Sequence, residues 1–97
     1  MKHFHRTSLD PDRVLELADG FFPTIGLAAT TREKRARGFS GPIGTLALTV
    51  AMEGGHYAFI EVHTDQMGES RLDRNVKKFF VQVHRAADPR HALEASY

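Results

Sequence analysis

The feature of this 97-residue chain that most restricts its fold is a pair of alternating apolar and polar runs joined by the dipeptide Gly54-Gly55, within GTLALTVAMEGGHYAFIEVHTD. Such alternation is typical of strands with one buried face. Two glycines between two alternating runs predict a hairpin with a two-residue turn, because glycine readily adopts the positive φ angles that this turn requires. The chain must therefore contain an antiparallel sheet.

The length of that turn decides which side chains share a face of the hairpin. A two-residue turn places Glu53 opposite His56, and the pairing continues outward from there. Leu48 and Val50 then occupy one face, and a second apolar group occupies the other, consisting of Ala58, Ile60 and Val62. A sheet that is apolar on both faces needs a second covering layer, which a second copy, another protein or an apolar ligand can supply.

A helix is expected on each side of the hairpin in the sequence. Asp10 and Pro11 suit the N-cap and the first position of a helix of about ten residues that ends near Gly20. Ser70 and Asp73 have the spacing of a capping box at the start of a second helix. The apolar residues of this second helix recur at the spacing of a single face. They are Leu72, Val76, Phe79, Phe80, Val83 and Ala87.

The order of these elements predicts an α+β domain. A further strand is expected within residues 27–39. Apolar and polar residues alternate only weakly in residues 3–8, so this segment could be either a first strand or a loose end. The prediction is an antiparallel sheet of three to four strands with two helices packed on one face, in the order (β)-α-β-β-β-α. Residues 1–97 form a single domain, in which 1–7 and 89–97 are the segments expected to be loose.

This order of elements resembles that of the helix-grip proteins of the START and Bet v1 type. In those proteins a strand and a helix precede an antiparallel sheet, and a long final helix lies in the curve of the sheet. The resemblance is one of element order, and this chain is several strands shorter. It implies a pocket between the sheet and the second helix, for a small apolar ligand that is carried or for the substrate of an enzyme.

Composition excludes several classes of protein. The chain has no cysteine, which removes disulfides, thiolate metal sites and cysteine nucleophiles together. It has neither an apolar signal segment at its start nor a run near the roughly 18 apolar residues that a membrane span needs. Motifs for nucleotide phosphates, for a hydrolase nucleophile and for zinc are absent. We therefore expect a soluble cytoplasmic protein without a cofactor or a membrane partner, and more readily a non-enzyme than an enzyme.

Positive charge is concentrated in two segments. Residues 32–37 carry four basic side chains and one acidic, and residues 71–97 carry six and three, whereas residues 38–70 carry none and four. Clustered Lys and Arg neutralise phosphates, which makes nucleic-acid binding through segments 32–37 and 71–85 a second hypothesis. The acidic middle of the chain counts against it. The candidate anion ligands are Arg32, Lys34, Arg35, Arg37, Arg74, Lys78 and Arg85.

Segment 32–37 also has a simpler interpretation. Its charges alternate between the two sides of an extended chain, so it cannot be a central strand. Lys and Arg on an exposed edge strand discourage other sheets from pairing with it. We therefore favour a role in solubility, and keep anion binding as the alternative.

Chemistry-bearing side chains occur together at the end of the last strand. Glu61, His63 and Asp65 occupy alternate positions, so they point to one side, and their imidazole and carboxylate groups suit a divalent metal or acid–base chemistry. A polar rim at the end of the sheet is the better-supported alternative, because a metal site usually draws ligands from more than one element. Neither a catalytic residue nor a bound metal is therefore predicted.

Together these patterns favour a non-enzymatic binding or protein-interaction module, with a homodimer as one form. Its partner would be itself or another protein. The predicted interaction surface includes Val81, an apolar residue expected on the solvent side of the second helix among basic residues, together with the second apolar face of the hairpin, Ala58, Ile60 and Val62. The alternatives are nucleic-acid binding and a helix-grip-like ligand carrier or enzyme.

Overall fold

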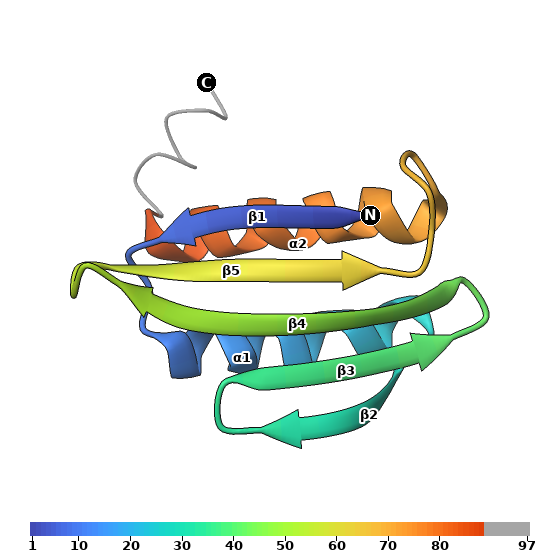
Figure 1. The fold of residues 1–97 in the computed structure, drawn as a ribbon, viewed down its shortest axis with the longest axis horizontal. Helices are drawn as coiled ribbons and strands as arrows, with labels where there is room; N and C mark the ends of the chain where they lie inside the picture. Colours follow the sequence, from blue (N-terminus) through green and yellow to red (C-terminus); the bar gives the residue numbers. More distant parts are fainter. Residues whose placement is uncertain (89–97) are drawn as a thin grey trace.

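The computed structural model describes residues 1–88, and these form one sheet with helices on one of its faces (Figure 1). The elements in chain order are β1 (Lys2–Thr7), α1 (Pro11–Phe21), the short 3-10 helix η1 (Phe22–Ile25), β2 (Ala28–Glu33), β3 (Ala36–Gly41), β4 (Gly44–Glu53), β5 (Tyr57–Thr64) and α2 (Arg71–Ala87). All neighbouring strands are antiparallel, in the spatial order β1-β5-β4-β3-β2. The α+β class is confirmed, but the described residues form five strands, where three to four were expected.

The additional strands arise at two places. Residues 2–7, which sequence left open between a strand and a loose end, form β1 and pair along β5. Residues 27–39, expected to hold one strand, contribute to both β2 and β3, which are joined by a turn at Lys34 and Arg35. This turn contains no Gly, Pro, Asn or Asp, so it gives no turn signal in the sequence. The predicted loose segment 89–97 lies outside the described residues.

The predicted hairpin forms between β4 and β5, but its predicted register is wrong by one residue. Glu53 pairs with Tyr57, because the loop includes His56 in addition to the two glycines. Gly54 and Gly55 have φ angles of 64° and 76°, so both adopt the positive φ that was expected of glycines in this turn. Since successive strand residues point to opposite faces, a shift of one residue exchanges the two faces of β5.

The core fills the space between the sheet and the helices. In the observed register Ala58, Ile60 and Val62 face the helices and are fully buried, so the prediction that they form a second, exposed apolar face is wrong. The helix α2 packs against them with a stripe of fully buried side chains, Leu72, Val76, Phe79 and Val83. These side chains occupy the space between the sheet and α2 to which the helix-grip resemblance assigned a ligand.

Candidate functional site

The face of the sheet opposite the helices is uncovered in residues 1–88, and we call it the open face (Figure 1). Alternation along β1 sends Lys2, Phe4 and Arg6 to the open face and the residues between them toward α2. The register of β1 against β5 places Arg6 beside Phe59. Phe4 lies on the same face of β1, and its side chain is 52% exposed although it belongs to a regular strand.

Four side chains of the open face form a continuous stack, which we call the ladder: Lys2, Phe4, Phe59 and Arg6. The rings of Phe4 and Phe59 are stacked, with centroids 5.4 Å apart and planes 18° from parallel. Lys2 Nζ lies 5.6 Å from the centroid of Phe4, and Arg6 Cζ lies 4.9 Å from that of Phe59. The ring stacking and the contact of Arg6 with Phe59 join β1 to β5 across the sheet, whereas the contact of Lys2 with Phe4 lies within β1.

Acidic side chains neutralise both cations of the ladder. Arg6 Nε donates to Glu53 Oε1 over 2.9 Å, and Lys2 Nζ lies 3.4 Å from Glu61 Oε1. Burial beside the ladder raises the pKa of Glu61, but the hydrogen bonds from His63 and Lys2 outweigh it, so the net shift of this pKa is downward. Together with Glu53 and Glu61, the ladder thus forms an exposed aromatic surface without net charge.

The predicted metal or acid–base group is only partly brought together. His63 Nε2 lies 3.3 Å from Glu61 Oε1, so these two residues are neighbours on the open face. Asp65 is separate: its Oδ1 accepts hydrogen bonds from the backbone N–H of Thr45 (3.0 Å) and from Gln66 (2.9 Å), and these lower its pKa. Among residues 1–88, no group of three or more His, Asp or Glu side chains could hold a metal ion.

The other half of the open face is flat. From Thr45 to Ala51 the exposed residues of β4 on this face are small, and the register places small residues of β3 and β2 beside them. This flat half consists of Ala28, Thr31, Ala36, Gly38, Ser40, Thr45, Ala47, Thr49 and Ala51. Glu33, opposite Ala36 on the edge strand β2, is the acidic residue at its border.

A buried polar network joins α2 to the sheet on the opposite side. Asp73 is 1% exposed, and its Oδ1 lies 2.7 Å from His3 Nε2 and accepts a hydrogen bond from Thr64 Oγ1 over 2.8 Å. Its Oδ2 accepts from Ser70 Oγ over 2.6 Å, while Ser70 Oγ caps the helix by accepting from the backbone N–H of Asp73. In a catalytic triad the serine hydroxyl donates to the histidine, which in turn is bonded to the aspartate. Here Ser70 donates directly to Asp73, so the three residues do not form a catalytic triad.

The network perturbs the acidity of its central carboxyl group. Burial by itself raises the pKa of Asp73, but the hydrogen bonds with Ser70, His3 and Thr64 favour the ionised form and lower the pKa overall. A buried carboxylate with three side-chain partners is a structural joint between β1, β5 and the start of α2. Sequence predicted its Ser70–Asp73 half and missed its partner on β1.

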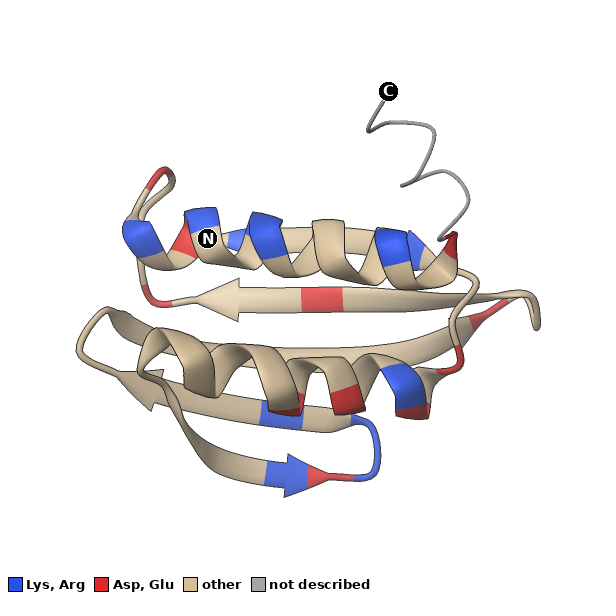
Figure 2. Ribbon diagram, turned by 180° about the vertical axis from the view of Figure 1, so that it is seen from behind, with Lys and Arg blue, Asp and Glu red and all other residues tan. Residues whose placement is uncertain are grey.

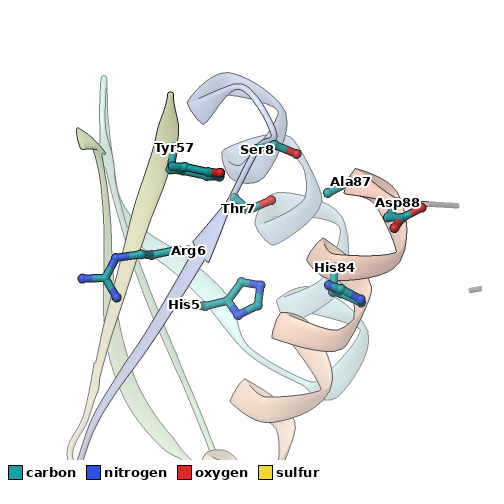
Figure 3. Close-up of a pocket in the computed structure, with 8 residues that line it drawn as sticks. All are labelled: His5, Arg6, Thr7, Ser8, Tyr57, His84, Ala87 and Asp88. Atoms are coloured by element: carbon teal, nitrogen blue, oxygen red, sulfur yellow. The ribbon is translucent and has the colours of Figure 1, made fainter. Parts of the chain in front are cut away.

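A shallow hollow of about 370 Å³ lies where β1 meets the end of α2 (Figure 3). His5 points from β1 toward α2, and its neighbour Arg6 points away (Figure 3). His5 stacks on Phe80, with ring centroids 5.1 Å apart, and its pKa is lowered by burial and then by the nearby His84. Although β1 and β5 are adjacent, His5 and His63 lie on opposite faces of the sheet.

The first predicted anion-binding segment is largely neutralised by α1. Arg32 and Arg37 both donate to Asp19, over 3.3 Å and 2.9 Å. Arg35 donates to Asp12 over 2.8 Å. Of the four basic residues in 32–37, only Lys34 forms no salt bridge within residues 1–88. Segment 32–37 is thus tied to α1 by its own charges.

In the second predicted segment, Lys77 pairs with Glu69 over 3.0 Å, but the predicted anion ligands have no such partner within residues 1–88. Arg74, Lys78 and Arg85 of α2 form no salt bridge with any residue among 1–88, and neither does Arg71, which sequence did not single out. Val81 is 48% exposed among them, as predicted. The sequence signal missed on the other side of the molecule was Lys2-x-Phe4-x-Arg6, whose alternation puts an aromatic residue between two cations on one face of a strand.

No protein-family model matches this chain, and no curated protein sequence matches it either. Among residues 1–88, neither helix has the length and apolar character needed to cross a bilayer. Function is therefore inferred from the open face and from the basic residues of α2 that form no salt bridge within residues 1–88.

Proposed function

We propose that this protein is a non-enzymatic binding module that associates with a second copy of itself through the open face. The observation that carries the proposal is the division of this face into a raised aromatic half on β1 and β5 and a flat half on β4, β3 and β2. A two-fold axis parallel to the strands and passing along β4 places each ladder over the flat half of the other copy. Raised and flat surfaces are then complementary, as an isologous interface requires.

The charges of the open face support the same arrangement. Both cations of the ladder are already ion-paired with acids of their own sheet, so covering the ladder leaves no unpaired charge. The two-fold operation also brings β1 of one copy over β2 of the other. The register of the sheet puts Glu33 level with Phe4, so it then lies at the rim between Lys2 and Arg6 of the second copy, where opposite charges favour the correct register.

The size of the face sets the expected strength. Five strands about 4.8 Å apart, with lengths of roughly 20 to 30 Å, give a sheet face on the order of 500 Å², before side chains are counted. A typical stable interface buries about 800 Å² on each partner. A reversible dimer with a dissociation constant in about the micromolar range is therefore expected, and not a permanent one.

The proposal is tested by sedimentation velocity over about 1 μM to 1 mM, a range that brackets micromolar affinities. The expected mass rises from 10.9 kDa for one chain toward twice that value. Ala47→Lys, at the centre of the flat half, places a flexible charge against the other copy and should hold the protein at the mass of one chain. Gln82→Lys adds the same charge on exposed α2 and should leave association unchanged. A wild-type mass of one chain throughout, or equal effects of the two variants, would exclude this interface.

A further inference from the structure

One side of α2 carries an unpaired row of basic residues: Arg71, Arg74, Lys78 and Arg85. Their separations of three, four and seven residues place them on one side of the helix. Figure 2 shows basic residues spaced along α2, in contrast to the acidic residues along α1. Within residues 1–88 none of the four forms a salt bridge, although most of the other basic side chains do.

This row borders a groove between the helices. Beside η1 there is a hollow of about 620 Å³, lined by Thr24, Ile25, Arg71, Arg74, Asn75 and Lys78. A second hollow, of about 340 Å³, lies beside the end of α1 and is lined by Phe21, Lys78, Val81, Gln82 and Arg85. Lys78 borders both hollows, so they are adjacent along the helix. We call the two together the cationic groove.

The acids of α1 and α2 form no salt bridge with the cations of the groove, and Glu69, just before α2, pairs with Lys77. Asp73, the one acidic residue within α2, is buried and bonded to His3 on the other side of the helix. Of the acids of α1, Asp12 and Asp19 are paired with arginines of β3 and its neighbours, and Glu16 with Arg13. Within residues 1–88 the charges are thus separated: the acids of α1 are paired inside the fold, and the cations of the groove remain available.

We propose that the cationic groove binds the phosphate backbone of a nucleic acid without regard to sequence. From residue 71 to 85, fourteen steps of about 1.5 Å give a row of about 21 Å. One strand of a duplex presents a phosphate about every 3.4 Å along the axis, so about six phosphates pass along the row. Three of the four cations are arginines, whose planar forks bind phosphate oxygens in pairs.

The length and chemistry of the groove distinguish this ligand from others. A small phosphate compound fills only the hollow beside η1 and leaves Arg85 without a partner. An acidic peptide needs pockets for its side chains, whereas the groove is lined mainly by polar and charged groups around Ile25, Phe21 and Val81. Backbone contacts of this kind position a nucleic acid but do not specify its sequence.

The experiment measures fluorescence anisotropy of a labelled random-sequence DNA duplex of about 20 base pairs, so that several phosphates span the row. Four phosphate contacts predict a slope of about −3.6 for log affinity against log salt, or a loss of about 150-fold between 50 and 200 mM salt. Absence of salt-dependent binding, or a slope no steeper than about −1, would overturn the proposal.

A matched pair of variants locates the binding site. Arg74→Gln/Lys78→Gln removes two charges from the groove and should lower the magnitude of the slope to about 1.8 and the affinity at 50 mM salt by at least about tenfold. Lys34→Gln/Arg35→Gln removes the same charge from segment 32–37 and should change affinity by less than about threefold. Circular dichroism checks that both variants fold. Equal losses in both would place binding outside the groove.

A competitor decides between nucleic acid and an acidic protein. Polyglutamate with the same number of charges as the duplex should displace it only at a concentration at least about tenfold above that of unlabelled duplex. Displacement at equal concentration would overturn the proposal in favour of an acidic peptide partner. Ala47→Lys, which disrupts the proposed dimer, should change the affinity for the duplex by less than about twofold relative to the wild type. The experiments can therefore reject nucleic-acid binding without rejecting the dimer, and the reverse.

Discussion

Removing the carboxylate of Asp73 should destabilise the fold more than removing any exposed acid. Asp73→Ala deletes three side-chain interactions, with His3, Thr64 and Ser70, at a position that is 1% exposed. Hydrogen bonds to charged groups contribute about 1.5 to 3 kcal/mol each, and release of the buried charge offsets part of the sum. We expect a loss of about 3 kcal/mol in the free energy of unfolding, equivalent to a melting temperature lower by about 12 to 24 °C.

The effect should depend on pH in one direction. The pKa of Asp73 is lowered in the folded state from its ordinary value of 3.8, so the unfolded chain binds a proton more readily. The stabilisation by this carboxylate is therefore complete above pH 3.8 and is lost as the pH falls through the lower, folded-state pKa. The difference in stability between the wild type and Asp73→Ala should shrink across that acidic window.

Urea denaturation followed by circular dichroism, at pH 7 and at steps down to the acid limit of folding, measures both quantities. Asp12→Ala is the control, because its ion pair with Arg35 is exposed and should contribute less than about 1 kcal/mol. If Asp73→Ala lowers the free energy of unfolding by less than about 1 kcal/mol, Asp73 does not join β1, β5 and α2 as described. A difference from the wild type that does not change with pH would refute the role of the ionised form.

Two further pairs of substitutions test the packing by the same denaturation assay. Gly41→Ala should destabilise the fold by at least about 1 kcal/mol, because the new Cβ overlaps the backbone carbonyl oxygen of Gly26. At Gly20 a new Cβ meets no atom within 4 Å, so Gly20→Ala should stabilise α1 by about 0.5 to 1 kcal/mol. A change of the same sign in both variants would contradict the contact at Gly41. Ile60→Ala should cost about 2 to 5 kcal/mol and Val81→Ala less than about 0.5 kcal/mol. A small effect at Ile60 would show that β5 does not have the described register.

The local signals in the sequence were reliable where the neighbouring residues decide the structure. Ser70 caps α2 as its spacing from Asp73 predicts, and α1 begins at Pro11 as predicted. The Ser70 cap works because the side chain and the backbone N–H that it satisfies lie within one turn of each other, whereas Asp10 occupies the N-cap of α1 without a side-chain hydrogen bond to the helix. The turn at Lys34 and Arg35 had no such signal, because its residues do not demand a special backbone conformation.

The register of the hairpin required more than the turn. Gly54-Gly55 fits loops of two or three residues, and these differ by one residue in pairing. Matching of apolar faces decides between them: only the longer loop places Leu48 and Val50 on the same face as Ile60. The burial gained by this match exceeds any preference between the turns, since each apolar side chain contributes about 1.5 to 3 kcal/mol on burial. The register of the hairpin could therefore be predicted from the apolar patterns of both strands considered together.

The two basic segments show why a charge count cannot locate a binding surface. Segment 32–37 and the basic residues of α2 look equivalent in the sequence, and both were candidates for anion binding. The fold places Asp12 and Asp19, seven residues apart and so on one face of α1, against the first segment alone. Those acids satisfy three of its four cations, whereas no acid among residues 1–88 forms a salt bridge with the four cations of the cationic groove. A basic run becomes a surface for an anionic partner only where no other element supplies the opposite charge, and in residues 1–88 that condition leaves Lys34 as a single charge but selects Arg71, Arg74, Lys78 and Arg85 as a row.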